Sequence, residues 1–87
     1  MEVEEVLCAH PSVLEAAVVG LPDPVYGERV KACLVARPGA RLEVEDVRGW
    51  ARARLARFKV PEVVEVLDVL PRNPNGKVMK ALLRLSA

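Results

Sequence analysis

The first third of the chain predicts a helix followed by a buried strand. Apolar side chains recur at three- and four-residue steps over residues 2–9, and Pro11 stops the pattern, which is typical of a short amphipathic helix. Residues 13–20 are then mostly apolar and rich in Val and Ala, which indicates a largely buried strand. His10 lies at the end of the predicted helix, where a lone histidine is expected to cap or to pack, not to catalyse.

The remaining two thirds predict two more strands and two more helices. Residues 28–37 alternate between apolar and polar side chains, which indicates a half-exposed strand that pairs antiparallel with the first. Residues 43–57 return to helical spacing with a basic outer face, and residues 63–68 read as a third strand. The apolar side chains of the last predicted helix are Val78, Leu82, Leu83 and Leu85.

These elements follow the order α-β-β-α-β-α without repeats, linkers or low-complexity segments. The simplest packing is a small three-stranded sheet covered by helices, so we predict one compact α+β domain over residues 1–87. A chain of 87 residues buries only about 60–65% of its unfolded surface, and a large internal substrate cavity is not expected.

Charge and composition narrow the classes of function. The chain has 13 basic and 12 acidic residues and only three aromatic residues, which gives no general reason to bind nucleic acid. No apolar run reaches membrane-spanning length, and the N-terminus is acidic where a secretory signal would be basic, so we expect a cytoplasmic protein without a membrane span. Cys8 and Cys33 lack a metal-binding grouping and are expected to be free, partly buried thiols.

The strongest candidate for chemistry is Lys77, within the segment Leu-Pro-Arg-Asn-Pro-Asn-Gly-Lys-Val-Met-Lys at residues 70–80. Two prolines and an Asn-Gly pair favour a turn, from which the lysine would project. An ammonium in that place can meet a phosphate or a carboxylate, although a solvated lysine near a helix start is the plainer alternative. Gly76 would let the loop approach a partner closely, or it is an ordinary turn glycine.

This segment resembles the lysine motif that closes the C-terminal domain of adenylate-forming enzymes, which include acyl-CoA synthetases, peptide-synthetase adenylation domains and luciferases. Residues 19–32 resemble the Gly-x-Pro-Asp-x-x-x-Gly-Glu stretch of that family, residues 56–61 resemble its Tyr-Lys-Val-Pro loop, and residues 4–11 resemble its opening helix. The four blocks occur in the order of the family and cover nearly the whole chain. The second block is most similar to acyl-CoA synthetases such as long- or medium-chain fatty-acid–CoA ligases.

The resemblance implies that residues 1–87 are a C-terminal lid domain and that the hinge and a large N-terminal domain lie outside them. That partner, in the same chain or as a separate subunit, would bind ATP, Mg and the carboxylic acid. Adenylation of the acid would be followed by rotation of the lid and thioester formation with coenzyme A or a carrier-protein thiol, as in fatty acid metabolism. Lys77 would contact the carboxylate and the α-phosphate region of ATP.

Other roles implied by the resemblance are less specific. Arg52 matches an arginine that contacts a phosphate of coenzyme A in some acyl-CoA synthetases, although exposed helix arginines are common. Phe58 and Lys59 align with a loop that borders the coenzyme A approach, yet Phe58 would also serve as a core plug at a helix end and Lys59 as a solvated charge. Glu28 follows the family pattern without an evident chemical role beyond holding a turn.

Three positions depart from the motif. Asn73 and Asn75 stand where the family usually has Thr and Ser or Thr, and both can still make turn hydrogen bonds. Lys80 replaces a frequent Arg. Acylation of Lys77 would remove its charge and is a further regulatory hypothesis from the resemblance.

A free-standing, non-catalytic interaction module that retains the fold is the alternative function. By itself, the chain is expected to fold but neither to adenylate an acid nor to form a thioester, because it has no visible nucleotide pocket. No Gly-rich phosphate loop, Ser/His/Asp grouping or metal-ligand cluster is visible in the sequence.

Overall fold

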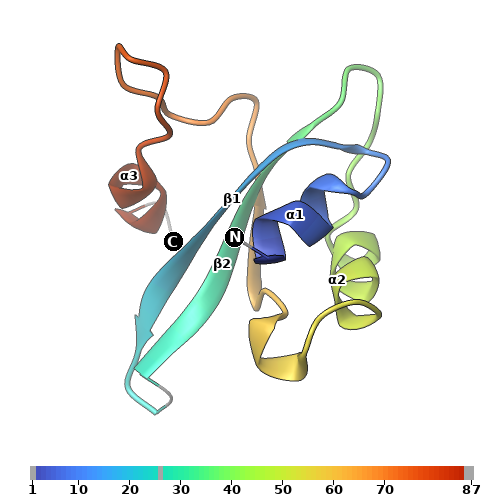
Figure 1. Cartoon of the computed structure of the whole chain (residues 1–87), viewed down its shortest axis with the longest axis vertical. Helices are drawn as coiled ribbons and strands as arrows, with labels where there is room; N and C mark the ends of the chain where they lie inside the picture. The colour runs from blue at the N-terminus through green and yellow to red at the C-terminus, as the bar shows by residue number, and fades with distance from the viewer. Residues whose placement is uncertain (1, 26, 86–87) are drawn as a thin grey trace.

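The structure is a computed structural model that describes residues 2–25 and 27–85, the side chain of Leu85 excepted. The predicted element order is confirmed, with one added turn of 3-10 helix (Figure 1). In chain order the elements are α1 (Glu2–Cys8), β1 (Val13–Asp23), β2 (Gly27–Ala36), α2 (Val44–Arg52), η1 (Arg57–Lys59), β3 (Val63–Val66) and α3 (Lys80–Leu85).

The three strands form one mixed sheet in the order β1-β2-β3. β1 and β2 pair antiparallel, as predicted, and they form a long ribbon whose register includes Val18 opposite Ala32 and Gly20 opposite Val30. β3 pairs parallel with β2. The ribbon extends three residues beyond the predicted end of the first strand because Leu21 and its neighbours continue the ladder to Asp23.

Helices cover both faces of the sheet, which corrects the prediction of a half-exposed second strand. All five residues from Lys31 to Val35 in β2 are buried. Ala32 and Leu34 pack in a cluster with α1 and α2, whereas Cys33 and Val35 pack in a second cluster with Leu83 of α3. Figure 1 shows α3 on one side of the sheet and α1 and α2 on the other. A central strand with both faces covered has no solvent face.

The second helix is shorter than predicted. α2 ends at Arg52, not at residue 57. Leu55 nevertheless remains buried, because its backbone N–H donates to the carbonyl of Ala51 (2.8 Å) and the turn carries the side chain into the core. Ala56 then adopts an extended conformation (φ −59°, ψ 147°), which separates α2 from η1. The apolar spacing of residues 43–57 thus reflects core contacts on both sides of a helix end.

The two cysteines are free, as expected, but they differ in burial. Cys33 is fully buried in β2, whereas Cys8 at the end of α1 is exposed, so the expected partial burial is wrong for both. Burial raises the pKa of the Cys33 thiol above its usual range; the Lys31 ammonium opposes this rise, and the Glu65 carboxylate adds to it. A protonated thiol without solvent access is a poor nucleophile.

We therefore expect alkylation to separate the two thiols. Under native conditions at mildly alkaline pH, iodoacetamide should modify Cys8, and Cys33 should react only in denaturant. Mass spectrometry of peptides containing each residue measures the two extents. Equal modification rates without denaturant would contradict the buried position of Cys33.

Candidate functional site

Lys77 is exposed on a tight loop that a short antiparallel bridge between Arg72 and Val78 closes. The side-chain oxygen of Asn73 accepts hydrogen bonds from the backbone N–H groups of Asn75 (2.9 Å) and Lys77 (3.0 Å). The backbone N–H of Asn73 in turn donates to the carbonyl of Lys77 (2.9 Å). Asn73 therefore makes the turn hydrogen bonds expected of it, and the backbone of Lys77 is fixed on both sides.

The base of this loop is attached to the sheet. Arg72 donates through Nη1 to the carbonyl of Gly76 (2.8 Å) and forms an ion pair through Nη2 with Glu15 of β1. The backbone N–H of Met79 donates to the carbonyl of Pro71 (2.8 Å), just before α3 begins. The loop is thus ordered before any partner meets it.

Gly76 is required by backbone conformation. Its φ is +85°, in the left-handed region that favours glycine, and a Cβ built there would have no heavy atom within 4 Å. Crowding is therefore not the reason for glycine in the chain itself. A close approach to a partner remains a prediction for Gly76.

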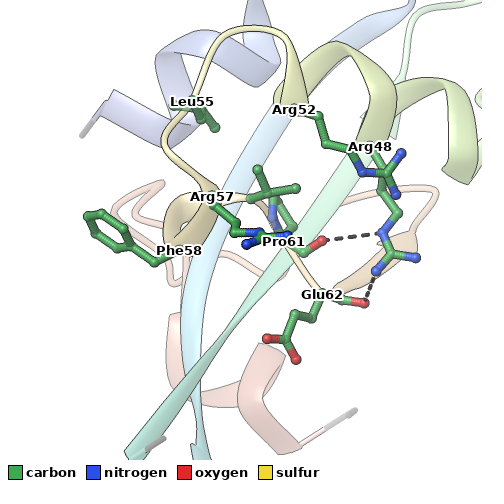
Figure 2. A pocket seen from close by; sticks show the side chains of 8 residues that line it. Arg48, Arg52, Leu55, Arg57, Phe58, Pro61 and Glu62 are labelled. Carbon is green, nitrogen blue, oxygen red and sulfur yellow. Dashed lines mark hydrogen bonds between the residues drawn. The ribbon is translucent and has the colours of Figure 1, made fainter.

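A second candidate site is an open groove of about 470 Å³ between α2 and the segment that follows it. Arg48 braces this groove, because its Nε donates to the carbonyl of Pro61 (3.3 Å) and its Nη2 to that of Glu62 (3.0 Å) (Figure 2). Arg52 also lines the groove and is 56% exposed, with its Nη2 lying 3.7 Å from a carboxylate oxygen of Glu45. Two guanidinium groups from α2 therefore line the groove, and Arg57 of η1 adds a third.

Phe58 lines the same groove, and its position corrects the sequence interpretation. The side chain is 78% exposed and does not plug the end of a helix. The reason is that η1 directs the ring outward (Figure 2), while Leu55 and Val60 on either side of η1 fill the core. An exposed ring beside arginines is suited to stacking on a planar group.

Lys59 lies in a neighbouring groove of about 1040 Å³ that Arg57 and Phe58 also line. Its ammonium forms an ion pair with Glu2 of α1, so it is not simply a solvated charge. The structure thus brings Arg52 and Phe58 together and places Lys59 next to them. Lys77 lines neither groove, and its loop lies at the opposite end of the molecule from η1 (Figure 1).

His10 packs as expected and has a partner that the sequence did not reveal. Its Nε2 lies 3.1 Å from Oδ2 of Asp46 in α2, and its Nδ1 accepts a hydrogen bond from the backbone N–H of Ser12 (3.1 Å). Its ring meets that of Trp50 edge-on, with centroids 5.0 Å apart. His10 therefore joins the end of α1 to α2 and has a structural role.

Glu28 also has a structural explanation. Its side chain crosses the ribbon and lies over Gly20 of β1, where an added Cβ would stand 2.2 Å from the Glu28 Cδ. The two residues belong to the block that carries the family resemblance. A glycine in β1 leaves room for the glutamate of β2.

Two further kinds of site find no support in the described part of the chain. Within residues 2–25 and 27–85, no group of three or more His, Cys, Asp or Glu side chains is arranged to hold a metal ion. None of the described helices has the length and apolar character needed to cross a membrane.

Comparison with known families gives a match over most of the chain. The family described as "AMP-binding enzyme C-terminal domain" matches residues 2–77. The chain belongs to this family. Its structural counterparts agree: the ATP-bound MatB of Rhodopseudomonas palustris superimposes with a TM-score of 0.91 at 40% identity, over 98% of this chain and 17% of MatB.

The curated relatives of this chain include proteins named as ligases. A propanoyl:CoA ligase of Rhodococcus jostii, acting on a methyl-dioxo-octahydroindenyl propanoyl group, is 51% identical over 83 residues, which are 95% of this chain and 16% of the relative. A fatty acid–[acyl-carrier-protein] ligase, ScoC of Streptomyces coeruleorubidus, is 46% identical over 95% of this chain and 16% of its own length. The chain thus spans about one sixth of these relatives.

Glu4 ties the opening helix of the C-terminal domain to the lysine motif. Its carboxylate accepts a hydrogen bond from the backbone N–H of Val18 (2.7 Å) and lies 3.0 Å from the ammonium of Lys80. Partial burial opposes ionisation, but the Val18 hydrogen bond and the Lys80 charge together lower the pKa of Glu4 below 4.5. The ionised form is therefore favoured by folding.

We expect Glu4→Gln to reduce stability at neutral pH but not in acid. A lowered pKa in the folded state stabilises above the unfolded pKa, and that contribution disappears as the pH falls through the folded pKa. Urea unfolding should therefore separate the variant from the parent at neutral pH and show no difference well below about pH 4. Glu5→Gln, on an exposed position of the same helix, is the control. A difference that persisted unchanged in acid would contradict the ionic role of Glu4.

Proposed function

We propose that this C-terminal domain acts as the lid of an acyl-CoA synthetase and supplies Lys77 for ATP-dependent adenylation of a carboxylic acid. The observation that carries the proposal is the preorganised loop, in which Asn73 fixes the backbone on both sides of an exposed Lys77. Family membership supports the reaction class, and the loop supports the choice of Lys77.

Lys77 contributes charge and position. When a carboxylate attacks the α-phosphate of ATP, negative charge develops on the phosphate oxygens, and an ammonium held nearby stabilises it. A preorganised donor of this kind is worth roughly 3–4 kcal/mol in a site from which water is excluded. The large N-terminal domain supplies that site, together with ATP, Mg and the acid, in the same chain or as a separate subunit. Gly76 lets the loop backbone approach it.

The groove of Arg52 and Phe58 serves the second half-reaction. A guanidinium is suited to a phosphate of coenzyme A, and an exposed aromatic ring is suited to stacking on its adenine. Lys59 adds a cation at the edge of this surface, although its ion pair with Glu2 competes with any ligand. Because the Lys77 loop lies at the opposite end of the domain from η1 (Figure 1), rotation of the lid presents either the loop or the groove to the same large domain.

The acid and the thiol acceptor are determined elsewhere. Relatives that are 43–51% identical to this chain are named for acids as different as a fused-ring propanoate, a fatty acid and ferulate. One of them is named for an acyl-carrier-protein acceptor in place of coenzyme A. A domain shared by such different ligases does not select the acid, and the acyl pocket lies in the large domain. The complete enzyme acts in the cytoplasm.

A fusion protein tests the proposal. The chain replaces the C-terminal domain of the Rhodococcus jostii ligase, and ATP-dependent acyl-CoA formation from the acid of that ligase is measured. We expect activity from the fusion and none from the 87 residues or the large domain supplied singly. A folded fusion without activity, or acyl-CoA formation by the 87 residues themselves, would refute the proposal.

A further inference from the structure

A lysine is buried beneath the last helix, on the face of the sheet opposite α1 and α2. Lys31 of β2 is only 1% exposed, and its ammonium donates to the carbonyl of Leu83 in α3 (2.7 Å) and lies 3.0 Å from Oε1 of Glu65 in β3. The alternation over residues 28–37 instead predicts Lys31 on the exposed face of the strand. A buried ammonium is costly unless it is paired and hydrogen-bonded, so these contacts define its place.

These contacts join α3 to the paired strands β2 and β3. α3 has only six residues, and a helix of that length is not stable without tertiary contacts. Among its described side chains, only Leu83 is buried. The bond from Lys31 thus attaches α3 to the sheet together with the burial of Leu83 and the hydrogen bond from Arg84 Nε to the carbonyl of Gly20 (3.3 Å).

The position of Leu83 within α3 makes its hydrogen bond with Lys31 more favourable. Leu83 belongs to the last turn of the helix, where carbonyl groups are oriented toward the C-terminus and a cation interacts favourably with the helix dipole. At the other end, Lys80 pairs with Glu4. The helix is thus held at both ends by a charged contact, one buried and one at the surface.

We propose that Lys31 is a positioning residue for adenylation, which it serves by holding α3 and with it the Lys77 loop. The inference rests on the proposed function of Lys77. Lys77 precedes α3 by three residues, and the backbone N–H of Met79 joins the loop base to the helix start. Release of α3 from the sheet changes the direction in which Lys77 enters the partner domain.

The effect is specific to the first half-reaction. The groove that contains Arg52 and Phe58 is lined by residues 48–62, and none of these belongs to α3. Loss of the Lys31 contact therefore leaves this groove in place. Of the two grooves, only the neighbouring one at Lys59, which Lys80 and Arg84 also line, borders α3. A general loss of folding would instead affect both half-reactions.

The test combines Lys31→Met in the fusion protein with hydrogen exchange in the 87-residue chain. Methionine has a similar length and removes the ammonium, and Glu65→Gln removes the partner charge while keeping its shape. Arg41→Met removes an exposed ion pair with Glu43 and is the control. Misplacement of a catalytic group by about 1 Å costs up to roughly 100-fold, so we expect adenylation to slow by about 10- to 100-fold in Lys31→Met. Thiolation of a supplied acyl-adenylate should be retained, and amides of α3 should exchange faster while those of β1 and β2 stay protected.

Three results would overturn the proposed role of Lys31. Unchanged adenylation in a folded Lys31→Met fusion, equal loss in both half-reactions, or unchanged exchange in α3 would overturn it. If Lys31→Met does not fold, Glu65→Gln carries the same prediction with a smaller loss, and an unchanged adenylation rate in that variant would overturn it as well. A parent fusion that is inactive refutes the proposed function instead, and α3 exchange then shows only whether Lys31 anchors the helix.

Discussion

Replacing Lys77 by alanine is expected to slow acyl-adenylate formation by about 100- to 1,000-fold in a complete enzyme that contains this domain. The ammonium acts where charge develops during attack on the α-phosphate, and the surrounding turn holds it there without a cost at the moment of reaction. Asn73 makes the hydrogen bonds that preorganise the turn. Alanine preserves those backbone contacts and removes only the charge.

The half-reactions have to be measured separately for this variant. Single-turnover formation of acyl-adenylate should collapse, whereas thioester formation from a supplied acyl-adenylate should change little. Arg41→Ala is the control, because it removes a cation from an exposed position outside both candidate sites. Equal loss in both half-reactions would show that Lys77 does not have the assigned role.

The converse result is expected when Arg52 and Phe58 are both replaced by alanine. Loss of a phosphate contact and of a stacking surface should lower kcat/KM for coenzyme A by about 30-fold or more, since each contact is worth roughly 1–3 kcal/mol. Adenylation should be unaffected, because Lys77 does not line this groove and its loop lies at the opposite end of the domain from η1 (Figure 1). Both side chains are exposed, so the substitutions should not unfold the chain.

Dephospho-coenzyme A distinguishes the two contributions to this effect. If Arg52 contacts the phosphate that this analogue lacks, Arg52→Ala should reduce the preference for coenzyme A over dephospho-coenzyme A. Phe58→Ala should lower kcat/KM equally for both thiols. Thiolation that is insensitive to both substitutions would contradict the assignment of the groove. The surface would then be free for another partner.

Hydrophobic periodicity was sufficient to predict the elements and their order, because each element has at least one face in the core. It was not sufficient for β2, where the alternation predicts an exposed Lys31 and where Cys33 is expected to be only partly buried. Their burial depends on α3, a helix about fifty residues further along the chain, and local alternation carries no information about such a cover. The only signal in the sequence for the burial of Lys31 was its place between apolar neighbours in a strand.

The candidate site shows the same division between local and distant effects. The turn at residues 73–76 was predictable, because Asn and Gly have local conformational preferences that the turn requires. The outward position of Phe58 was not, because it depends on the end of α2 at Arg52, which apolar spacing concealed by continuing to Leu55. The partnership of His10 with Asp46 joins residues that are distant in sequence and has no local signal.

ATP–pyrophosphate exchange dependent on the carboxylic acid is the measurement that tests the central claim most directly. The assay isolates adenylation, and it compares the large domain of the Rhodococcus jostii ligase with and without this chain fused to it. The account predicts acid-dependent exchange that requires the fused chain and that is lost in Lys77→Ala. Exchange that is equally fast without the chain, or that survives Lys77→Ala undiminished, would contradict it.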